Sequence, residues 1–407
     1  MVRAFNHQKH NLNRNIKNIS DRVIYCGVND RTTDLFEGLW DLPAGVSYNS
    51  YVVRGSDASA IIDASDSGHA PEYLHHIEEI LGGCAPDYLV INHMEPDHSG
   101  VLPMLLSRYP ALKLVCNAKT VDMLKGFYGI ESNVVVMAEG ETLSLGDRTL
   151  QFIMTPMVHW PETMFTYLQE EGILFTGDAL GCFGALNGAV IDDYMAADHY
   201  FREAYRYYGC IVAKYGTFVE KAFAKIAPLT VNYICTTHGP VWHSRREEIC
   251  GQYARMARWE GNPGVVVAYG SMYGNTTAMA EEIASRLAEN GVRDIVMYDL
   301  SRTPLSHVLG EVMRLKGLVM VSPTYNSEIY PPVAHLADAL VARGVKNRVI
   351  GIAGSYAWGS QSVRKLVAKF EGKPVEVIAP TAEMKQAMID SAKDAMAEMA
   401  SVMAAKL

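Results

Sequence analysis

The sequence predicts an α/β protein of two domains, a mixed layered half followed by a parallel sheet with crossover helices. Three observations predict this architecture. The chain has 407 residues, and at about 150 residues per domain it should form two or three domains. Residues 21–260 contain many short apolar runs separated by Gly, Asp and Pro, whereas residues 261–407 alternate regularly between strand-like and helix-like segments. Because the second pattern is typical of a parallel sheet, we expect a domain boundary at the Gly-Asn-Pro-Gly turn of residues 261–264.

The elements expected in the first half are short strands, with helical stretches between some of them. β-Branched and apolar residues concentrate in short runs bounded by turn-forming residues, which indicates strands. The expected strands are residues 50–54, 60–63, 88–92, 112–116, 134–137, 150–155, 172–176 and 233–236. Residues 1–20 are rich in Asn, His and Lys and lack the apolar stretch of a secretory signal, so we expect a polar, solvated tail.

The second half is expected to hold five β-α units. The strand-like runs are residues 265–269, 294–298, 318–322, 348–353 and 375–378. Each run is followed by a helix-like segment, and the last segment is rich in Ala and Met. Five such units make one doubly wound, flavodoxin-like parallel sheet, which binds its ligand at the carboxyl ends of the strands.

Composition and cysteine spacing exclude several classes of protein. Hydrophobic residues make up 49% of the chain and charged residues 20%, so a disordered chain is disfavoured. The 36 Lys and Arg against 45 Asp and Glu leave a net charge of -9, which argues against a nucleic-acid partner. The seven cysteines contain no C-x-x-C pair, so a disulfide framework and a rubredoxin-type iron site are not expected, and a reducing cytoplasm is the simplest setting. No apolar run approaches the roughly 20 residues needed to cross a membrane.

A dense polar cluster follows the apolar run of residues 88–91. Its sequence is Asn-His-Met-Glu-Pro-Asp-His-Ser-Gly over residues 92–100, and it offers nitrogen and oxygen donors just past a strand end. A single His or Asp at a strand end usually satisfies local backbone groups only. Seven ligand-type residues that all lie at strand ends are improbable as scattered structural polar residues. We therefore predict a site for two metal ions, each with its own coordination shell. The seven are His93, Glu95, Asp97, His98, His159, Asp178 and His238.

The spacing of these residues resembles the metallo-β-lactamase superfamily, whose nucleus is H-x-H-x-D-H followed by a distant His, Asp and His. The resemblance implies an αββα sandwich for residues 21–260. This chain departs from the zinc hydrolases at Glu95, where they carry a second His. A carboxylate makes the site harder and more anionic, which shifts its preference from zinc toward iron or manganese.

A carboxylate at this position, in a chain that continues into a flavodoxin-like domain, is the pattern of the flavodiiron proteins, which the sequence resembles over nearly its whole length. The resemblance implies that one iron is held by His93, Glu95 and His159, the other by Asp97, His98 and His238, with Asp178 bridging. In parts of this family the residue matching His98 does not bind the metal. The segments His-Trp-Pro-Glu-Thr-Met at 159–164 and Thr-Gly-Asp at 176–178 also resemble family sequence.

Three loops of the second half predict an FMN site. The first opens the helix that follows the strand at 265–269, and its hydroxyl, amide and backbone N–H groups suit one monophosphate. It has no Walker lysine and no G-x-G-x-x-G, so a nucleoside triphosphate or a dinucleotide is not the natural ligand. The other two follow the third and fourth strands, and each brings an aromatic side chain able to stack on a flavin ring. The predicted contacts are Ser271, Met272, Tyr273, Gly274, Asn275 and Thr276, then Pro323, Thr324, Tyr325 and Asn326, then Ser355, Tyr356, Ala357, Trp358 and Gly359.

These loops also resemble those of the flavodiiron family, with one departure. Flavodoxins usually carry a hydroxyl residue where this chain has Tyr273. The alternative for Trp358 is a partly buried surface anchor, which the flavin interpretation outweighs because all three loops fall at strand carboxyl ends of one sheet.

The resemblance implies an oxidoreductase that reduces O2 to water, NO to N2O, or both, with the seven metal ligands as the catalytic residues. FMN stores two electrons and two ferrous ions supply one each, which matches the four that full reduction of O2 requires. An external donor is needed because the chain has neither a cysteine pair for a rubredoxin-type iron nor a dinucleotide motif. Within the family the donor is rubredoxin or reduced coenzyme F420, and the flavin of one chain faces the metal site of another in a head-to-tail homodimer or a dimer of dimers.

Two other functions remain open from the sequence. The first is a zinc-dependent metallo-β-lactamase-type hydrolase with an appended flavodoxin-like module. The second is an electron-transfer flavoprotein whose metal site is structural. The first predicts zinc without redox chemistry, and the second predicts that loss of Asp178 leaves terminal oxidase activity intact.

Overall fold

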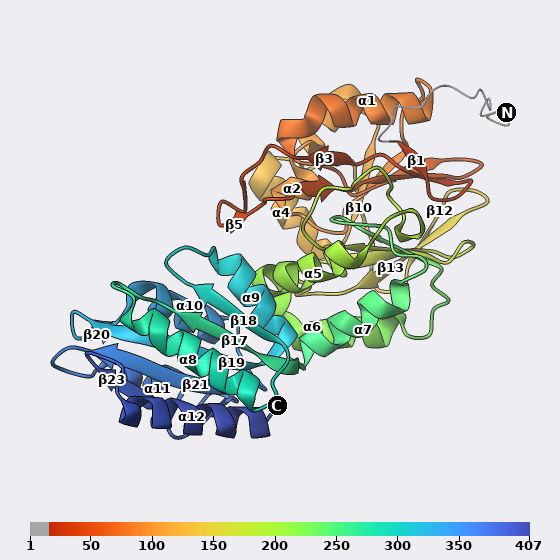
Figure 1. Ribbon diagram of the computed structural model, residues 1–407. Helices are drawn as coiled ribbons and strands as arrows, with labels where there is room; N and C mark the ends of the chain where they lie inside the picture. The colour runs from red at the N-terminus through yellow and green to blue at the C-terminus, as the bar shows by residue number, and fades with distance from the viewer. Residues whose placement is uncertain (1–15) are drawn as a thin grey trace. The chain divides into compact units, whose positions relative to one another are not determined.

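The computed structural model describes residues 16–407, so the first 15 residues of the expected tail lie outside the described part (Figure 1). The chain divides into two compact units. The first contains the chain up to Phe36, Leu42–Ala204 and Thr217–Ala254, and the second contains Glu37–Asp41, Tyr205–Gly216 and Arg255–Leu407. Two short segments of the first half therefore group with the second unit. No helix in the described residues combines the length and apolar character needed to span a bilayer.

The first unit is built on two sheets. The strand order of the first sheet is β1-β2-β7-β8-β9-β10-β11, and that of the second is β12-β13-β14-β15-β16. The bounds of the first sheet are β1 (Lys17–Asn18), β2 (Val23–Tyr25), β7 (Tyr51–Arg54), β8 (Ser59–Ile62), β9 (Tyr88–Val90), β10 (Lys113–Cys116) and β11 (Val134–Val136). Those of the second are β12 (Thr142–Ser144), β13 (Thr149–Met154), β14 (Met164–Leu168), β15 (Ile173–Gly177) and β16 (Tyr233–Thr236).

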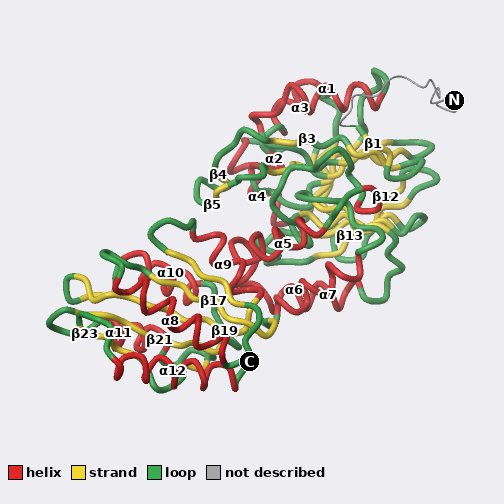
Figure 2. The backbone as a smooth tube through the Cα atoms, viewed as in Figure 1, coloured by secondary structure: helices red, strands yellow, loops and turns green. Residues whose placement is uncertain are grey.

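Helices cover the outer faces of these sheets, which gives the expected αββα sandwich. Figure 2 shows α1 and α3 on one side of the strands and α6 and α7 on the other. The helices are α1 (Ala70–Leu81), α2 (Pro96–Ser99), α3 (Leu102–Arg108), α4 (Ala118–Tyr128), α5 (Asp198–Tyr207), α6 (Gly216–Ile226) and α7 (Arg246–Ala257), with η1 (Ser67–His69), η2 (Asp192–Tyr194), η3 (Tyr208–Val212) and η4 (Ala213–Tyr215). The remaining short strands are β3 (Val28–Asp30), β4 (Leu35–Phe36), β5 (Trp40–Asp41) and β6 (Val46–Tyr48).

Side chains that alternate along the first sheet fill two different core layers. Val52, Leu89 and Leu114 belong to a buried cluster with the helix residues Tyr73 and Leu105. The neighbouring residues face the second sheet, and the ring of Tyr51 in β7 lies 5.3 Å from that of Phe175 in β15. Because both faces are covered, these strands read as nearly continuous apolar runs, which is why the sequence predicted them.

The expected strands of the first half correspond to β7, β8, β9, β10, β11, β13, β15 and β16, with ends that differ by two residues at most. The sequence interpretation missed β14, which begins at Met164 directly after the polar segment that carries His159. It also missed β1, whose Lys17 and Asn18 pair with Tyr25 and Ile24 although they were expected in the polar tail.

The second unit contains the predicted parallel sheet, in the order β18-β17-β19-β21-β22. Helices α8 and α12 share one buried cluster with alternate residues of β17 and β19, including Val265, Val267, Val319 and Val321. The strands are β17 (Asn262–Tyr269), β18 (Ile295–Asp299), β19 (Leu315–Tyr325), β20 (Glu328–Ile329), β21 (Val349–Tyr356), β22 (Glu376–Val377) and β23 (Ala382–Lys385). The helices are α8 (Asn275–Glu289), α9 (Leu305–Arg314), α10 (Pro331–Ala342), α11 (Ser362–Phe370) and α12 (Asp390–Ala405). This strand order is the flavodoxin-like one.

The fifth strand differs from the prediction because it is divided in two. β22 pairs with residues 349–350 of β21, and β23 pairs with residues 353–356 of the same strand. Pro380 lies between the two pieces. Since proline has no N–H to donate to a neighbouring strand, the ladder is interrupted there.

Arg348 ties the start of the second unit to its sheet. Its side chain is 1% exposed. Nε donates to the carbonyl oxygen of Val312 at 2.8 Å, Nη2 donates to that of Met313 at 2.9 Å, and Nη1 donates to that of Trp259. The guanidinium also lies over the Trp259 ring, 5.4 Å from its centroid. A buried cation is tolerated here because backbone carbonyl oxygens accept hydrogen bonds from its N–H groups.

Replacing Arg348 should therefore destabilise the second unit. Arg348→Met fills a similar space but leaves three buried carbonyl oxygens without a donor, each costing about 1–3 kcal/mol. We expect a loss of at least about 3 kcal/mol in the free energy of unfolding, measured by urea denaturation. Arg364→Met, at an exposed position of α11, is the matched control and should change it by about 0.5 kcal/mol or less. Equal stability of the two variants would contradict this account.

Candidate functional site

The seven predicted metal ligands converge where strands of both sheets of the first unit end. His93, Glu95, Asp97 and His98 follow β9, the last two within the short helix α2. His159 lies between β13 and β14, Asp178 follows β15, and His238 follows β16. The structure brings all seven together in two groups, the first formed by His93, Glu95, His159 and Asp178 and the second by Asp97, His98 and His238. We call them cluster 1 and cluster 2.

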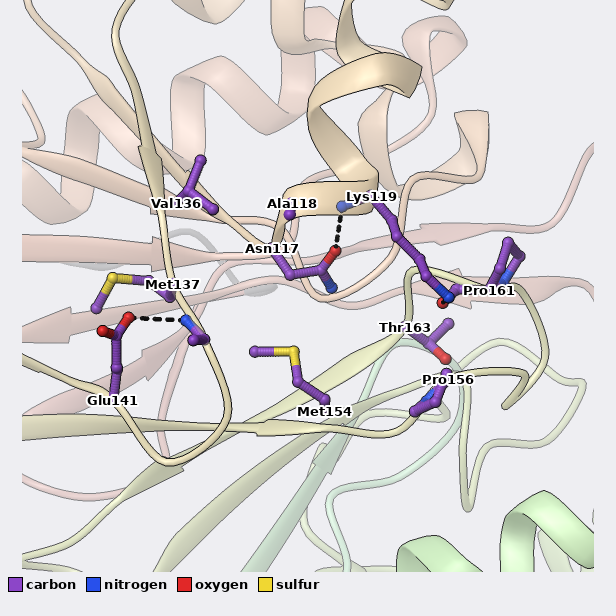
Figure 3. A pocket seen from close by; sticks show the side chains of 11 residues that line it. Asn117, Ala118, Lys119, Val136, Met137, Glu141, Met154, Pro156, Pro161 and Thr163 are labelled. Carbon is purple, nitrogen blue, oxygen red and sulfur yellow. Dashed lines mark hydrogen bonds between the residues drawn. The ribbon is translucent and has the colours of Figure 1, made fainter.

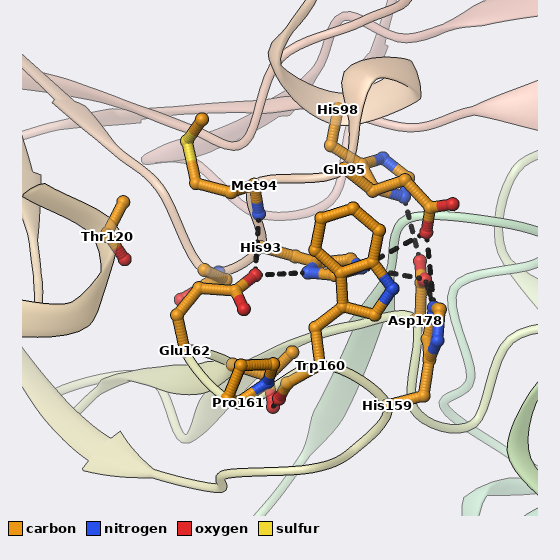
Figure 4. A network of polar contacts seen from close by, with 12 residues as sticks. His93, Met94, Glu95, His98, Thr120, His159, Trp160, Pro161, Glu162 and Asp178 are labelled. Atoms are coloured by element: carbon orange, nitrogen blue, oxygen red, sulfur yellow. Dashed lines mark hydrogen bonds and ion pairs between the residues drawn. The ribbon is translucent and has the colours of Figure 1, made fainter. Parts of the chain in front are cut away.

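Cluster 1 brings two imidazoles and two carboxylates to one point (Figure 4). Glu95 Oε2 lies 3.2 Å from both His93 Nε2 and His159 Nε2. Asp178 Oδ2 lies 3.1 Å from His159 Nε2 and 3.5 Å from His93 Nε2. One ligand atom from each of the four residues lies within 4.8 Å of the others, a separation that one metal ion can span.

Cluster 2 is similar in chemistry and shares the carboxylate of Asp178. Asp97 Oδ2 lies 3.3 Å from His98 Nε2 and 3.2 Å from His238 Nε2. Asp178 Oδ1 lies 2.8 Å from His98 Nε2 and 3.5 Å from His238 Nε2. The two oxygens of Asp178 therefore face different clusters, which is the arrangement of a carboxylate that bridges two metals.

Burial and close charges shift the pKa values of these groups in opposite directions. Burial alone would lower the pKa of His159, but its hydrogen bonds to Asp178 and Glu95 raise it to about 9. Burial also opposes the rise for His98, whose pKa reaches about 9 because Asp97 and Asp178 lie close. For Asp178, burial would raise the pKa, yet His98 and His159 hold it well below its usual range. The carboxylates of Glu95 and Asp178, whose pKa values are both lowered, are thus ionised at neutral pH and can attract a cation.

Several buried atoms of cluster 2 are placed to bind a metal ion and do not form hydrogen bonds with one another. Both carboxylate oxygens of Asp97 and Nε2 of His98 are buried and make no hydrogen bond among the described residues. Yet the Asp97 and His98 atoms approach within 3.3 Å. Close approach without hydrogen-bond alignment is the geometry of donor atoms that converge on a shared cation, so the residues fit a metal pair.

Three residues around the clusters hold the ligands in place, and the sequence reasoning assigned them no role. Glu162 Oε1 lies 2.7 Å from His93 Nδ1, and the Ser47 carbonyl oxygen lies 2.7 Å from His238 Nδ1. Thr237 Oγ1 donates to Asp178 Oδ1 at 2.6 Å. A sequence signal existed for Glu162 and Thr237, because each is close in the chain to a predicted ligand. Their partners could be found only from the fold.

Aromatic rings enclose the histidines. The ring of Trp160 meets that of His93 edge to face at 5.2 Å, and the ring of Phe36 meets that of His238 at 5.3 Å. Tyr48 adds a second ring 5.8 Å from His238. These contacts fix the imidazole planes and keep water from the sides of the site.

A separate pocket of about 440 Å³ lies beside the loop that carries His159 (Figure 3). None of the seven ligands lines it. Its walls are mostly apolar, with Lys119 and Glu141 as the charged residues. The lining residues are Asn117, Ala118, Lys119, Val136, Met137, Ala138, Glu141, Met154, Pro156, Pro161 and Thr163.

In the second unit, the predicted flavin contacts gather at the carboxyl ends of β17, β19 and β21, which are neighbours in the sheet. Gly274 precedes α8 with φ of 95°, a conformation that favours glycine. Ser271 Oγ accepts a hydrogen bond from the Gly274 N–H at 3.1 Å, and Thr276 Oγ1 lies 2.9 Å from Ser355 Oγ. The first and third segments therefore contact each other.

Two details of these segments differ from the prediction. Pro323, Thr324 and Tyr325 form the end of β19, and Ser355 and Tyr356 form the end of β21, so they are strand residues and not loop residues. The side chains of Tyr273 and Trp358 are 92% and 94% exposed. Neither ring stabilises the unit by burial, so the alternative of Trp358 as a partly buried anchor is wrong.

Comparison with known proteins agrees with both units. The model of the ODP family of β-lactamases matches residues 46–239, and the flavodoxin model matches residues 267–398. A nitric oxide reductase of Moorella thermoacetica is 31% identical over 365 residues, covering 89% of this chain and 91% of its own. The anaerobic nitric oxide reductase flavorubredoxin of Escherichia coli is 30% identical, covering 88% of this chain and 76% of its own.

The structure of a rubredoxin oxygen:oxidoreductase from Desulfovibrio gigas superposes with a TM-score of 0.91 at 26% identity. The superposition covers 96% of this chain and 98% of that one. Similarity in sequence and in fold thus extends through both units, and the chain belongs to the family of flavodiiron proteins.

Proposed function

We propose that this protein is an oxidoreductase that reduces O2 to water, NO to N2O, or both, at two irons held by clusters 1 and 2. The observation that carries the proposal is the carboxylate of Asp178, whose two oxygens face the two clusters. The names of its relatives support the choice of substrate, since they include nitric oxide reductases and an oxygen oxidoreductase.

Each predicted ligand has a place in this proposal. His93, Glu95 and His159 would hold the first iron, Asp97, His98 and His238 would hold the second, and Asp178 would contribute one oxygen to each. The carboxylate of Glu95 favours iron over zinc because it is a harder ligand than imidazole. When bound, the irons supply one electron each and FMN supplies two, the four electrons that full reduction of O2 requires.

The chain's own residues prepare the site for this chemistry. Glu95, Asp97 and Asp178 bring three negative charges that offset the charge of two divalent cations. Trp160 and Phe36 shield the histidines from water at the sides. Shielding strengthens the attraction between ligand and cation, because the local dielectric constant is low.

FMN belongs to the flavodoxin-like unit, and we propose specific contacts for it. Ser271–Thr276 surround the phosphate at the N-terminus of α8, where free N–H groups and the helix dipole favour an anion. Thr324, Tyr325 and Asn326 and the segment from Ser355 to Gly359 hold the ring. The exposure of Tyr273 and Trp358 leaves both rings accessible to a flavin.

The proposed partners rest on similarity to the flavodiiron family. We propose an external electron donor, rubredoxin or reduced coenzyme F420, and a head-to-tail homodimer or dimer of dimers. Residues 21–260 form the diiron domain and residues 261–407 the FMN domain. A cytoplasmic location is supported by the seven cysteines, all of which carry free thiols.

The hydrolase alternative is disfavoured. A flavodoxin model matches the second half, and two relatives that match most of the chain are named as nitric oxide reductases. Zinc has no redox chemistry, so the electrons carried by FMN would have no role in a zinc hydrolase.

The purified chain should contain about two irons and one FMN. Metal analysis by plasma mass spectrometry and a visible spectrum after flavin extraction measure both. We expect two irons and one FMN because the chain has two metal clusters and one sheet whose first loop suits a single phosphate. Zinc without flavin would support the hydrolase instead.

Asp178→Ala should abolish gas reduction, because it removes the oxygen atoms shared by both clusters. Removal of a residue outside the ligand set typically costs about 10–100-fold in metal affinity or activity, so loss of a shared ligand should cost at least about 100-fold in turnover. Flavin reduction by the donor should persist. Asp122→Ala, at an exposed position of α4, is the control and should behave as wild type. Retained oxidase activity in Asp178→Ala would favour the electron-transfer flavoprotein.

Turnover on O2 and on NO should be compared with one defined reduced donor. We expect consumption of at least one gas, with water as the product of O2 and N2O as the product of NO. Gas electrodes and headspace chromatography measure these. Consumption of neither gas, with both cofactors loaded, would defeat the proposed function.

A further inference from the structure

We propose that Glu162 is a positioning residue that makes the two clusters unequal, so that cluster 1 binds a divalent metal more tightly than cluster 2. This inference rests on the proposed function, because it assumes that both clusters hold metal. It concerns residues outside the seven predicted ligands.

Glu162 is fixed from two sides. Its side chain is 1% exposed, and Oε1 accepts hydrogen bonds from His93 Nδ1 at 2.7 Å and from the Met94 N–H at 3.0 Å (Figure 4). Its backbone carbonyl accepts a hydrogen bond from the side-chain amide of Asn117. The oxygen of Asn117 in turn caps α4 by accepting from the Lys119 N–H at 3.0 Å. The carboxylate therefore has a defined position against His93.

This contact decides which nitrogen of His93 is available to a metal. A carboxylate at Nδ1 keeps the proton there, so the lone pair is on Nε2, the atom that faces Glu95 and Asp178. A negative charge behind the ring also makes Nε2 a stronger donor. Glu162 thus orients His93 and increases its basicity toward cluster 1.

The Nδ1 atoms of the cluster 2 histidines have different surroundings among the described residues. His238 Nδ1 faces the neutral carbonyl oxygen of Ser47 at 2.7 Å. His98 Nδ1 is buried and makes no hydrogen bond within the described part of the chain. Binding a metal through His98 Nε2 would place a proton on this buried Nδ1 without an acceptor, which opposes binding.

The shared carboxylate adds to the difference. Asp178 Oδ1, which faces His98, accepts a hydrogen bond from the Thr237 hydroxyl at 2.6 Å. A donor at this oxygen draws charge away from cluster 2. Each cluster also has one carboxylate of its own, Glu95 or Asp97, so these two contributions offset each other. The contacts at His93, His98 and Asp178 Oδ1 described above favour cluster 1.

The test uses the full-length chain with FMN retained and iron removed by chelation, and Co²⁺ as the probe. At one Co²⁺ per chain, anomalous scattering from crystals reports which cluster is occupied, and visible absorption in solution gives the two affinities. Wild type should place Co²⁺ in cluster 1. Glu162→Gln keeps the size of the side chain and an acceptor for Nδ1–H but loses the charge. It should weaken the tighter site by about 10–100-fold and move Co²⁺ toward cluster 2.

Three further variants make the result specific. Glu162→Ala should weaken cluster 1 at least as much as Glu162→Gln does. Thr237→Val removes the hydrogen-bond donor at Asp178 Oδ1, so it should reduce the difference between the affinities of the two clusters. Glu141→Gln is the matched control, since Glu141 also accepts from a backbone N–H, that of Ala138 at 2.7 Å, but contacts no predicted ligand.

Three outcomes would count against the inference. Equal occupancy of the clusters in wild type would overturn the inequality. Equal weakening of both sites in Glu162→Gln would show a merely structural role for Glu162. Absence of Co²⁺ from both clusters would overturn the metal assignment itself, and with it the proposed function.

Discussion

The carboxylate of Asp178 lies fully inside the first unit, and four imidazoles surround it. Burying such a charge is costly unless opposite charge and hydrogen bonds compensate. The compensation here comes from residues that follow strands of both sheets, so it exists only when the sandwich is assembled. Packing of the two sheets, such as the contact between Tyr51 and Phe175, is therefore a condition for the site. The ligands in turn form one polar centre inside the sandwich, and two metal ions can bind to its ligand atoms.

Much of the site could be predicted because its chemistry is carried by local sequence. All seven ligands lie at strand ends, four of them in one segment after β9, and strand ends are where such folds gather polar groups. What the sequence could not give are partners that come from distant segments. His93 and Glu162 are 69 positions apart, and His238 and Ser47 are 191 apart. Nothing local shows which way an imidazole is oriented, and this orientation decides which nitrogen is available.

The fold was predictable to a similar extent, and for a physical reason. Strands buried on both faces produce long apolar runs, as in β17, β19 and β21, and all five β-α units were found. Two of the failures fall where one residue interrupts a pattern or where a strand has little apolar content. Pro380 divides the fifth strand, and Lys17 and Asn18 form β1 with polar side chains. Pairing in these places depends on neighbours in space.

The position of Arg348 has a consequence for how the second unit can be separated from the rest of the chain. A fragment cut at residue 261 would lose Trp259, and with it both the carbonyl and the ring that contact the guanidinium. The sequence turn at 261–264 suggests that cut, but the last and longest segment of the second unit begins at Arg255. A flavin-binding fragment that starts at Arg255 keeps every carbonyl oxygen that accepts a hydrogen bond from Arg348. A fragment that starts at residue 261 lacks the Trp259 contacts, so the guanidinium of Arg348 loses part of its surroundings. The last segment of the second unit thus starts before the glycines of residues 261–264, where the sequence pattern predicts the boundary.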